Sequence, residues 1–103
     1  MKRLPLFLLS ALCALAQDTR GTISGTVTDP QSAVVAGANV TVVNTGTNTT
    51  TKLTTNASGY FEAPLLLPGA YTVTVELAGF KRAVRSGITL GIGEQLRIDV
   101  GLE

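Results

Sequence analysis

The residue types that most hydrolytic enzymes use are scarce in this sequence of 103 residues. It contains no histidine, and Cys13 is its single cysteine. Ser-His-Asp and Cys-His nucleophiles need an imidazole base, and zinc sites mostly use imidazole or thiolate ligands. The glycine pair in Gly91-Ile92-Gly93 is not followed by a helical pattern, so it predicts a turn and not a phosphate cradle. The composition therefore argues against the usual nucleophilic active sites, zinc sites and phosphate-binding loops.

The carboxylates are spread along the chain instead of being clustered. Glu62 and Glu76 are the one pair expected on neighbouring strands, and both are expected to face solvent. Asp29 with Asn44 or Asp99 could offer oxygen ligands to calcium, but no loop has the dense acidic spacing of a calcium site. We therefore expect no enzymatic activity, no cofactor and no metal.

Aromatic rings are the remaining side chains that could bind a ligand, because sugar faces stack on exposed rings. The chain has no tryptophan. Phe61 and Tyr71 fall on strand positions expected to point inward, which leaves Tyr60 and Phe80 as weak candidate ligand contacts. Each also has a structural interpretation, Tyr60 as a residue flanking a hairpin and Phe80 as a plug at one end of the fold.

The first sixteen residues have the three parts of a secretory signal peptide. Met1–Arg3 is basic, Leu4–Leu12 is apolar, and Ala14–Ala16 is a small-x-small triplet. The apolar run is too short for the roughly 20 residues of a membrane-spanning helix. We expect cleavage between Ala16 and Gln17, so that residues 1–16 are the signal peptide and residues 17–103 are one exported domain.

Cys13 lies inside the segment that cleavage removes. Lipid attachment there would need a small residue just before the cysteine, but Leu12 occupies that position. The mature chain then has no disulfide, although an oxidising compartment would permit one. We expect a periplasmic, outer-membrane-associated or secreted protein with no membrane span in its mature chain.

After the signal the sequence alternates apolar and polar residues between recurrent turn residues, the pattern of an all-β domain. No later segment has a convincing helical period. Packing the strands as two antiparallel sheets is the most economical arrangement for a domain of this size. The seven predicted strands cover residues 22–28, 38–42, 49–55, 60–65, 71–77, 82–90 and 96–102.

The alternation also predicts which residues form the core and which strands lie at edges. The predicted core consists of Val40, Val42, Phe61, Tyr71, Val73, Val75, Leu96, Ile98 and Val100, with Thr41, Thr72, Thr74, Arg97 and Asp99 outward. The Thr-rich third strand buries little beyond Leu53 and is predicted at an edge. Lys81-Arg82 with Arg85 is interpreted as a charged, solvated strand edge in preference to a binding patch, and a charged edge of this kind discourages strand pairing with other chains.

The balance of charge argues against a nucleic-acid partner. Of eight basic and seven acidic residues, Lys2 and Arg3 are lost with the signal, so the mature chain is close to neutral. Nucleic-acid binding calls for a strongly basic face.

The mature sequence resembles a carboxypeptidase regulatory-like domain. The matching elements are Gly25–Val27 with Asp29, Gly37-Ala38-x-Val40-x-Val42, Thr54-x-x-x-x-Gly59-x-Phe61, Leu67-Pro68-Gly69-x-Tyr71-x-Val73-x-Val75, and Gly79-Phe80. The resemblance implies a seven-stranded antiparallel β-sandwich of the transthyretin, or prealbumin-like, type, which is grouped with carbohydrate-binding-like folds. It is most similar to the version found directly after the signal peptide of TonB-dependent outer-membrane receptors.

Two departures from the family pattern concern the first long loop and the length of the chain. Ser32 and Ala36 stand where members often have glycine and proline, which leaves the conformation of that loop open. A receptor of this class would continue into a plug and a barrel, so the chain is either a free-standing domain or a fragment of a larger reading frame.

Two functions follow from the resemblance. The favoured one is a non-catalytic accessory or interaction domain of the cell envelope, whose partner is an envelope protein or the rest of a larger receptor. The alternative is a carbohydrate-binding module, whose partner is a sugar.

Overall fold

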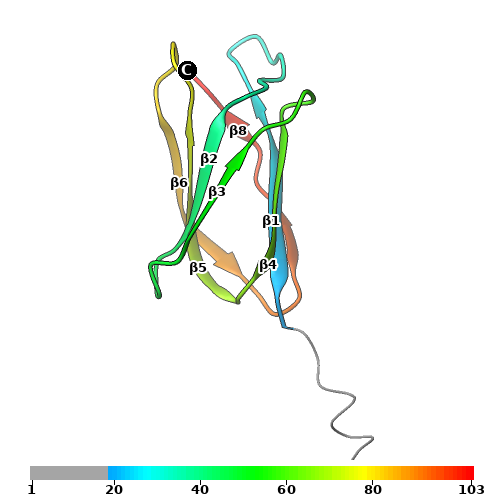
Figure 1. Cartoon of the computed structure of the whole chain (residues 1–103), viewed down its shortest axis with the longest axis vertical. Helices are drawn as coiled ribbons and strands as arrows, with labels where there is room; N and C mark the ends of the chain where they lie inside the picture. The colour runs from blue at the N-terminus through cyan, green and yellow to red at the C-terminus, as the bar shows by residue number, and fades with distance from the viewer. Residues whose placement is uncertain (1–18) are drawn as a thin grey trace, which may run out of the picture.

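The chain folds into two facing β-sheets, and residues 19–103 contain no helix (Figure 1). The computed structural model describes residues 19–103, so the predicted signal peptide and its cleavage site at Ala16 and Gln17 lie outside the described residues. The strands are β1 Gly21–Thr28, β2 Asn39–Asn44, β3 Thr50–Thr54, β4 Tyr60–Leu66, β5 Gly69–Glu76, β6 Ala83–Leu90, β7 Gln95–Arg97 and β8 Val100–Gly101.

One sheet has the order β4-β1-β7, with β8 also pairing with β1, and the other has the order β3-β2-β5-β6. The all-β sandwich predicted from the sequence is confirmed. The predicted seventh strand is divided into β7 and β8, so the strand count is eight instead of seven. The predicted edge positions of the third and sixth strands are also confirmed, since β3 and β6 end their sheet.

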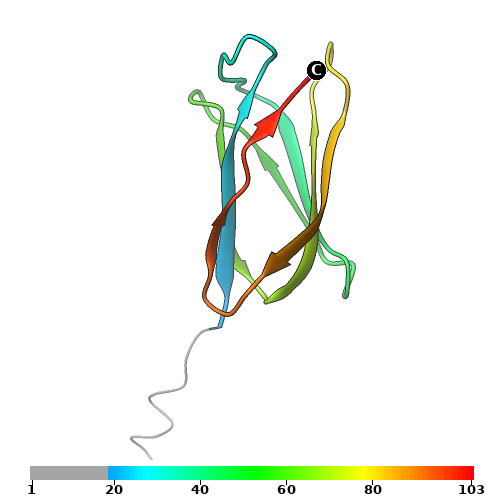
Figure 2. The ribbon, with the colours of Figure 1, turned by 180° about the vertical axis from the view of Figure 1, so that it is seen from behind.

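The prediction of a wholly antiparallel sandwich is wrong for the last two strands, because β7 and β8 run parallel to β1. The reason is visible in Figure 2: β6 ends at the same end of the sandwich at which β1 begins. The turn after β6 is fixed to the start of β1 by the hydrogen bond from Thr22 N to Glu94 O, 2.9 Å long. The chain therefore enters beside the start of β1 and follows it in the same direction.

The core lies between the two sheets and has the predicted strand register. Val40, Val42, Phe61, Tyr71, Val73, Val75 and Val100 are buried, while Leu96 and Ile98 are partly buried and pack against the core. Arg97 and Asp99 are exposed, and the threonines that alternate with the valines of β5 are half-buried. A shift of one residue would have exchanged these two sets, so the alternation determined the register.

Gly25 allows the last segment of the chain to cross closely over β1. It lies on the buried face of β1, between Ile23 and Val27. A Cβ atom at this position would overlap the carbonyl oxygen of Ile98, the residue between β7 and β8. Only glycine leaves room for the carbonyl group of Ile98, which explains the glycine at position 25.

The two sheets meet at two long edges, which we name the β3/β4 seam and the β6/β8 seam after the strands that face each other there. At the β3/β4 seam, the loop through residues 55–59 connects one sheet to the other. At the β6/β8 seam no segment of residues 19–103 joins the two strands directly, and residues of both line one hollow. The residues described below as candidate sites lie along these seams.

Candidate functional site

The two aromatic rings singled out from the sequence lie on different sheets. Tyr60 begins β4 and is half-buried, and its hydroxyl donates to Glu62 Oε1 at 3.3 Å. Phe80 lies in the turn between β5 and β6 and packs against the core. The shallow hollow beside Phe80 is lined by Asn39, Glu76, Leu77, Ala78 and Arg82. Tyr60 does not line it, so this hollow does not bring the two rings together.

The carboxylate pair expected on neighbouring strands is also separated. Glu62 lies on β4 and Glu76 on β5, and these strands belong to different sheets, so that expectation is wrong. Asp29 shapes the β1–β2 loop, because its Oδ1 accepts from Gln31 N and Ala33 N at 2.9 Å each. Within residues 19–103 there is no group of three or more Asp, Glu, Cys or His that could hold a metal ion.

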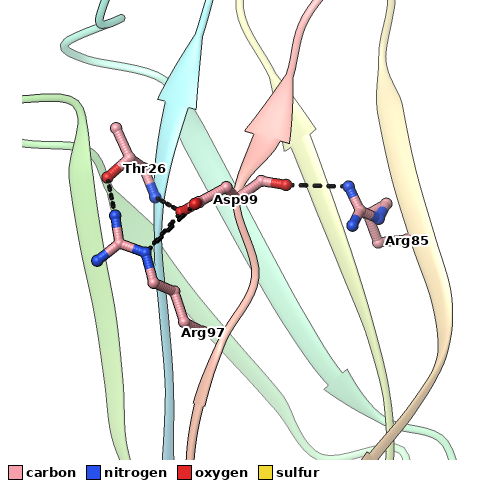
Figure 3. Close-up of polar contacts among 4 residues, drawn as sticks. All are labelled: Thr26, Arg85, Arg97 and Asp99. Atoms are coloured by element: carbon pink, nitrogen blue, oxygen red, sulfur yellow. Dashed lines mark hydrogen bonds and ion pairs between the residues drawn. The ribbon is translucent and has the colours of Figure 1, made fainter.

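Asp99 is the centre of a polar cluster that the sequence did not reveal (Figure 3). Its Oδ1 accepts from the backbone N–H of Thr26 at 3.0 Å and from Nε of Arg97 at 3.0 Å. Arg97 Nη2 donates to Thr26 Oγ1 at 2.9 Å. Because the carboxylate replaces a backbone acceptor for β1, Asp99 explains why pairing with β1 is interrupted between β7 and β8.

Arg85 extends this cluster across the β6/β8 seam. From β6 in one sheet, its Nη1 donates to the carbonyl oxygen of Asp99 in the other at 2.9 Å (Figure 3). The side chains of Arg97 and Asp99 are each 60% exposed, and exposed pairs contribute little to stability. The cluster connects the edges of the two sheets through the Arg85 hydrogen bond, and its exposed ion pair adds little to the free energy of folding. Arg97 and Asp99 are two residues apart, hence on the same side of an extended chain, and that spacing was the one available sequence signal.

A basic hollow of about 280 Å³ lies along the β6/β8 seam. Its lining residues come from β6, from β8 and from the segments next to them: Lys81, Arg82, Ala83, Val84, Arg85, Val100, Gly101 and Glu103. At one end the seam is closed by the hydrogen bond from Lys81 N to Glu103 O, 2.8 Å long. The hollow can therefore present cations beside strand edges that have no partner strand.

A second groove, of about 350 Å³, lies at the β3/β4 seam. Its lining mixes polar and apolar residues: Arg20, Asn44, Thr47, Thr49, Thr51, Pro64, Leu65, Leu66, Leu67 and Tyr71. Leu65 and Leu67 are 65% and 53% exposed. Leu65 has a φ of 59° within a β-bulge, where β4 has one more residue than the facing part of β1. The bulge turns this side chain outward, which the alternation of the sequence did not predict.

A buried hydrogen-bond network supports the floor of this groove. The Tyr71 hydroxyl donates to Leu67 O at 2.5 Å and accepts from Asn44 Nδ2 at 3.2 Å. Asn44 Oδ1 in turn accepts from Gly46 N at 2.9 Å and Thr47 N at 3.1 Å. The network connects the β2–β3 loop to the β4–β5 loop and fixes the shape of the groove.

The family model for the carboxypeptidase regulatory-like domain matches residues 22–103. The chain belongs to this family. The match includes the strands of both sheets and both seams. No helix within the described part of the chain is long and apolar enough to cross a membrane.

A curated relative is the TonB-dependent transporter Oar of Myxococcus xanthus, which is 40% identical over 97 residues. The alignment covers 92% of this chain and 9% of the transporter, so the chain spans a small part of that relative. The resemblance to a receptor-associated member of the family is therefore confirmed.

Solved structures show the same fold. The Bacillus anthracis TIE protein matches with a TM-score of 0.71 and 26% identity, over 82% of this chain and 16% of that one. A putative carbohydrate binding protein from Bacteroides uniformis matches with a TM-score of 0.64 and 17% identity, over 84% and 42% of the two chains. Hydroxyquinol 1,2-dioxygenase from Pseudomonas putida matches with a TM-score of 0.68 and 11% identity, over 86% and 58%. The last two are too dissimilar in sequence to indicate more than the fold.

Proposed function

We propose that residues 17–103 form a non-catalytic accessory domain of the bacterial cell envelope, which follows a signal peptide of residues 1–16 and contacts either an envelope protein or the rest of a larger receptor. The observation that carries this proposal is the 40% identity to a TonB-dependent transporter over nearly the whole chain. The family match over residues 22–103 supports the same assignment.

The roles of the carboxylates support a structural domain over a catalytic one. Asp29 accepts from two backbone N–H groups in the β1–β2 loop, and Asp99 accepts from the N–H of Thr26. Glu94 Oε1 accepts from Gly91 N at 2.8 Å and closes the turn before β7. These carboxylates are occupied in holding the backbone, whereas a general acid or base must reach a substrate.

Export can be tested by expressing the whole chain with a carboxy-terminal tag in a Gram-negative host. We expect the protein in the periplasm or envelope fraction, with an intact mass that starts at Gln17, allowing for cyclisation of that glutamine. A product that keeps Met1 in the cytoplasm, or one that starts at a lipidated Cys13, would contradict the proposal. Cross-linking in the same cells should attach the domain to an envelope protein.

The second candidate is a carbohydrate-binding module, which the fold shared with the putative carbohydrate binding protein favours. The side chains that would serve it are Tyr60 and Phe80. Titration with a panel of oligosaccharides, followed by NMR, should shift the resonances around these two rings if the module binds sugar. Saturable shifts that Tyr60→Ala and Phe80→Ala both remove would favour this candidate over a passive accessory domain.

A further inference from the structure

The outer edge of β6 has no partner strand in residues 19–103. β6 is eight residues long and pairs only with β5, while β8, on the other side of the seam, pairs only with β1. The edges are tied by two polar contacts, Lys81 N to Glu103 O at 2.8 Å and Arg85 Nη1 to Asp99 O at 2.9 Å. Backbone groups along an unpaired edge can accept another strand.

This edge is also the most basic part of the described chain. Lys81, Arg82 and Arg85 lie within five residues of one another and are exposed. The only ion pair within residues 19–103 joins Arg97 and Asp99, so none of these three cations has a carboxylate within 4.0 Å there. Glu103 is the one acidic residue that lines the hollow beside them. Arg85 already donates to Asp99 O, so the cations of this edge whose side chains make no hydrogen bond or ion pair within residues 19–103 are Lys81 and Arg82, and both favour a negatively charged partner.

Two positions on β6 are open to a neighbouring chain, one of them in the segment between Arg85 and Ile88 where β6 has one residue more than the facing part of β5. Val84 is 50% exposed and offers an apolar contact on this strand. At Gly87, where φ is 72°, an added Cβ atom would meet nothing within 4 Å. In strand addition, main-chain hydrogen bonds give affinity and side-chain contacts give specificity. The β6 edge offers unpaired backbone groups for the first, and an exposed apolar side chain with nearby cations for the second.

We propose that the β6 edge binds an acidic, extended segment of a partner protein by strand addition, with the partner's carboxylates paired to Lys81, Arg82 and Arg85. This inference rests on the proposed accessory function and names the kind of partner. A polypeptide fits better than an anionic lipid surface because Arg85 on β6, with Lys81 and Arg82 just before this strand, lies beside backbone groups that only another backbone can pair with. Exposed charges of this kind mainly raise the association rate and make binding sensitive to salt.

A synthetic peptide of four Glu-Val repeats, blocked at both ends, is a suitable probe for the exported chain as purified. In an NMR titration at low salt we expect saturable shifts of the amides of residues 81–90, and weaker binding as salt is added. The double variant Lys81→Glu with Arg82→Glu should weaken binding about tenfold or more, a change of about 1.4 kcal/mol or more. Lys52→Glu, a charge reversal on the exposed edge strand β3, is the matched control and should leave affinity unchanged.

A second peptide separates strand addition from simple charge attraction. Methylation of alternate backbone nitrogens keeps the carboxylates but removes the N–H donors, so this peptide should bind at least tenfold more weakly. Equal binding of both peptides, equal losses in the two charge-reversal proteins, or no binding at low salt would overturn the inference. Binding to phosphatidylglycerol vesicles that excludes the peptide would assign the edge to a lipid surface instead.

The two proposals fail in different ways. Circular dichroism of each variant identifies a loss of folding, and a misfolded variant is replaced by Arg82→Gln, which removes charge without reversing it. If the exported chain still cross-links to an envelope protein but ignores the peptide, the accessory function stands and the β6 edge is the wrong surface. If the chain is not exported, the proposed function fails whatever the peptide does.

Discussion

At the β3/β4 seam the two facing strands are joined directly by the loop through residues 55–59. At the β6/β8 seam the chain passes from β6 to β8 by way of β7, and the two strands are held by the Arg85 contact to Asp99 and the Lys81 contact to Glu103. The first seam exposes leucines above a buried Asn44–Tyr71 network, and the second exposes cations beside unpaired strand edges. A sandwich can therefore close its edges in two ways. The seam between directly connected strands exposes apolar side chains, while the seam between β6 and β8 is held by charged and polar groups.

The largest expected effect comes from Gly25→Ala, which acts on the β8 side of the β6/β8 seam through the packing of the last segment against β1. The new Cβ atom would overlap Ile98 O and force β7 and β8 away from β1. We expect a loss of about 3 kcal/mol in the free energy of unfolding, at the upper end for overpacking. Gly101→Ala in β8 is the control, since an added Cβ there has one neighbour, Thr28 Oγ1, at 4.0 Å. Equal losses for the two variants in urea titrations would show that the close crossing does not matter.

A substitution in the core between the sheets gives a reference value for the stability losses expected at the two seams. Val73 on β5 is fully buried, whereas the neighbouring Thr72 is half-buried and points outward. Val73→Ala should cost about 2 kcal/mol, from lost burial and the cavity that remains, and Thr72→Ala should cost much less. The reverse order in a denaturant titration would mean that the register of β5 is shifted by one residue.

Tyr71→Phe tests how much the buried hydrogen bonds at the β3/β4 seam contribute to stability. The substitution keeps the ring in the core but leaves Leu67 O and Asn44 Nδ2 without the hydroxyl that both contact. We expect a loss of about 1 kcal/mol and faster amide exchange in the β2–β3 and β4–β5 loops only. Tyr60→Phe, which removes an exposed contact to Glu62, should be close to neutral. We expect the two seams to respond separately. Faster amide exchange at β8 in the Tyr71→Phe variant would contradict that expectation.

The smallest effect is expected for Arg97→Ala at the β6/β8 seam. The side chains of Arg97 and Asp99 are both 60% exposed, so solvent screens their attraction. We expect a loss of about 0.5 kcal/mol or less, which added salt should reduce further. A loss above that of Tyr71→Phe would show that the cluster around Asp99 is a principal support of the fold.

The alternation of apolar and polar residues was sufficient to predict the core residues and the edge strands. Its periodicity shows which face of each strand is buried, and a strand that buries little belongs at an edge. Val40, Val42, Val73 and Val75 all point inward as predicted. The same periodicity is identical for parallel and antiparallel pairing, so the direction of β7 and β8 relative to β1 was not recoverable from it. That direction depends on where the β6 strand ends in space.

The polar features of the seams were missed for a different reason. Asp99 and Thr26 are 73 residues apart, and nothing local to either residue indicates the other. The exposure of Leu65 depends on a bulge, which adds one residue and changes the side on which the following side chains point. The charged character of the β6 edge was predicted, since a cluster of cations is a property of composition and needs no partner. The cleavage site between Ala16 and Gln17 stays a prediction.

The parallel pairing of the first strand with the last also determines how the domain would carry mechanical tension. The described chain begins at one end of the sandwich and finishes at the other, and β1 lies beside β7 and β8 along much of that length (Figure 2). A pull applied at the two ends therefore loads the hydrogen bonds between these strands together, in shear, instead of peeling them one at a time. In single-molecule pulling we expect a higher rupture force along this axis than for a pull that separates β5 from β6 at their shared turn.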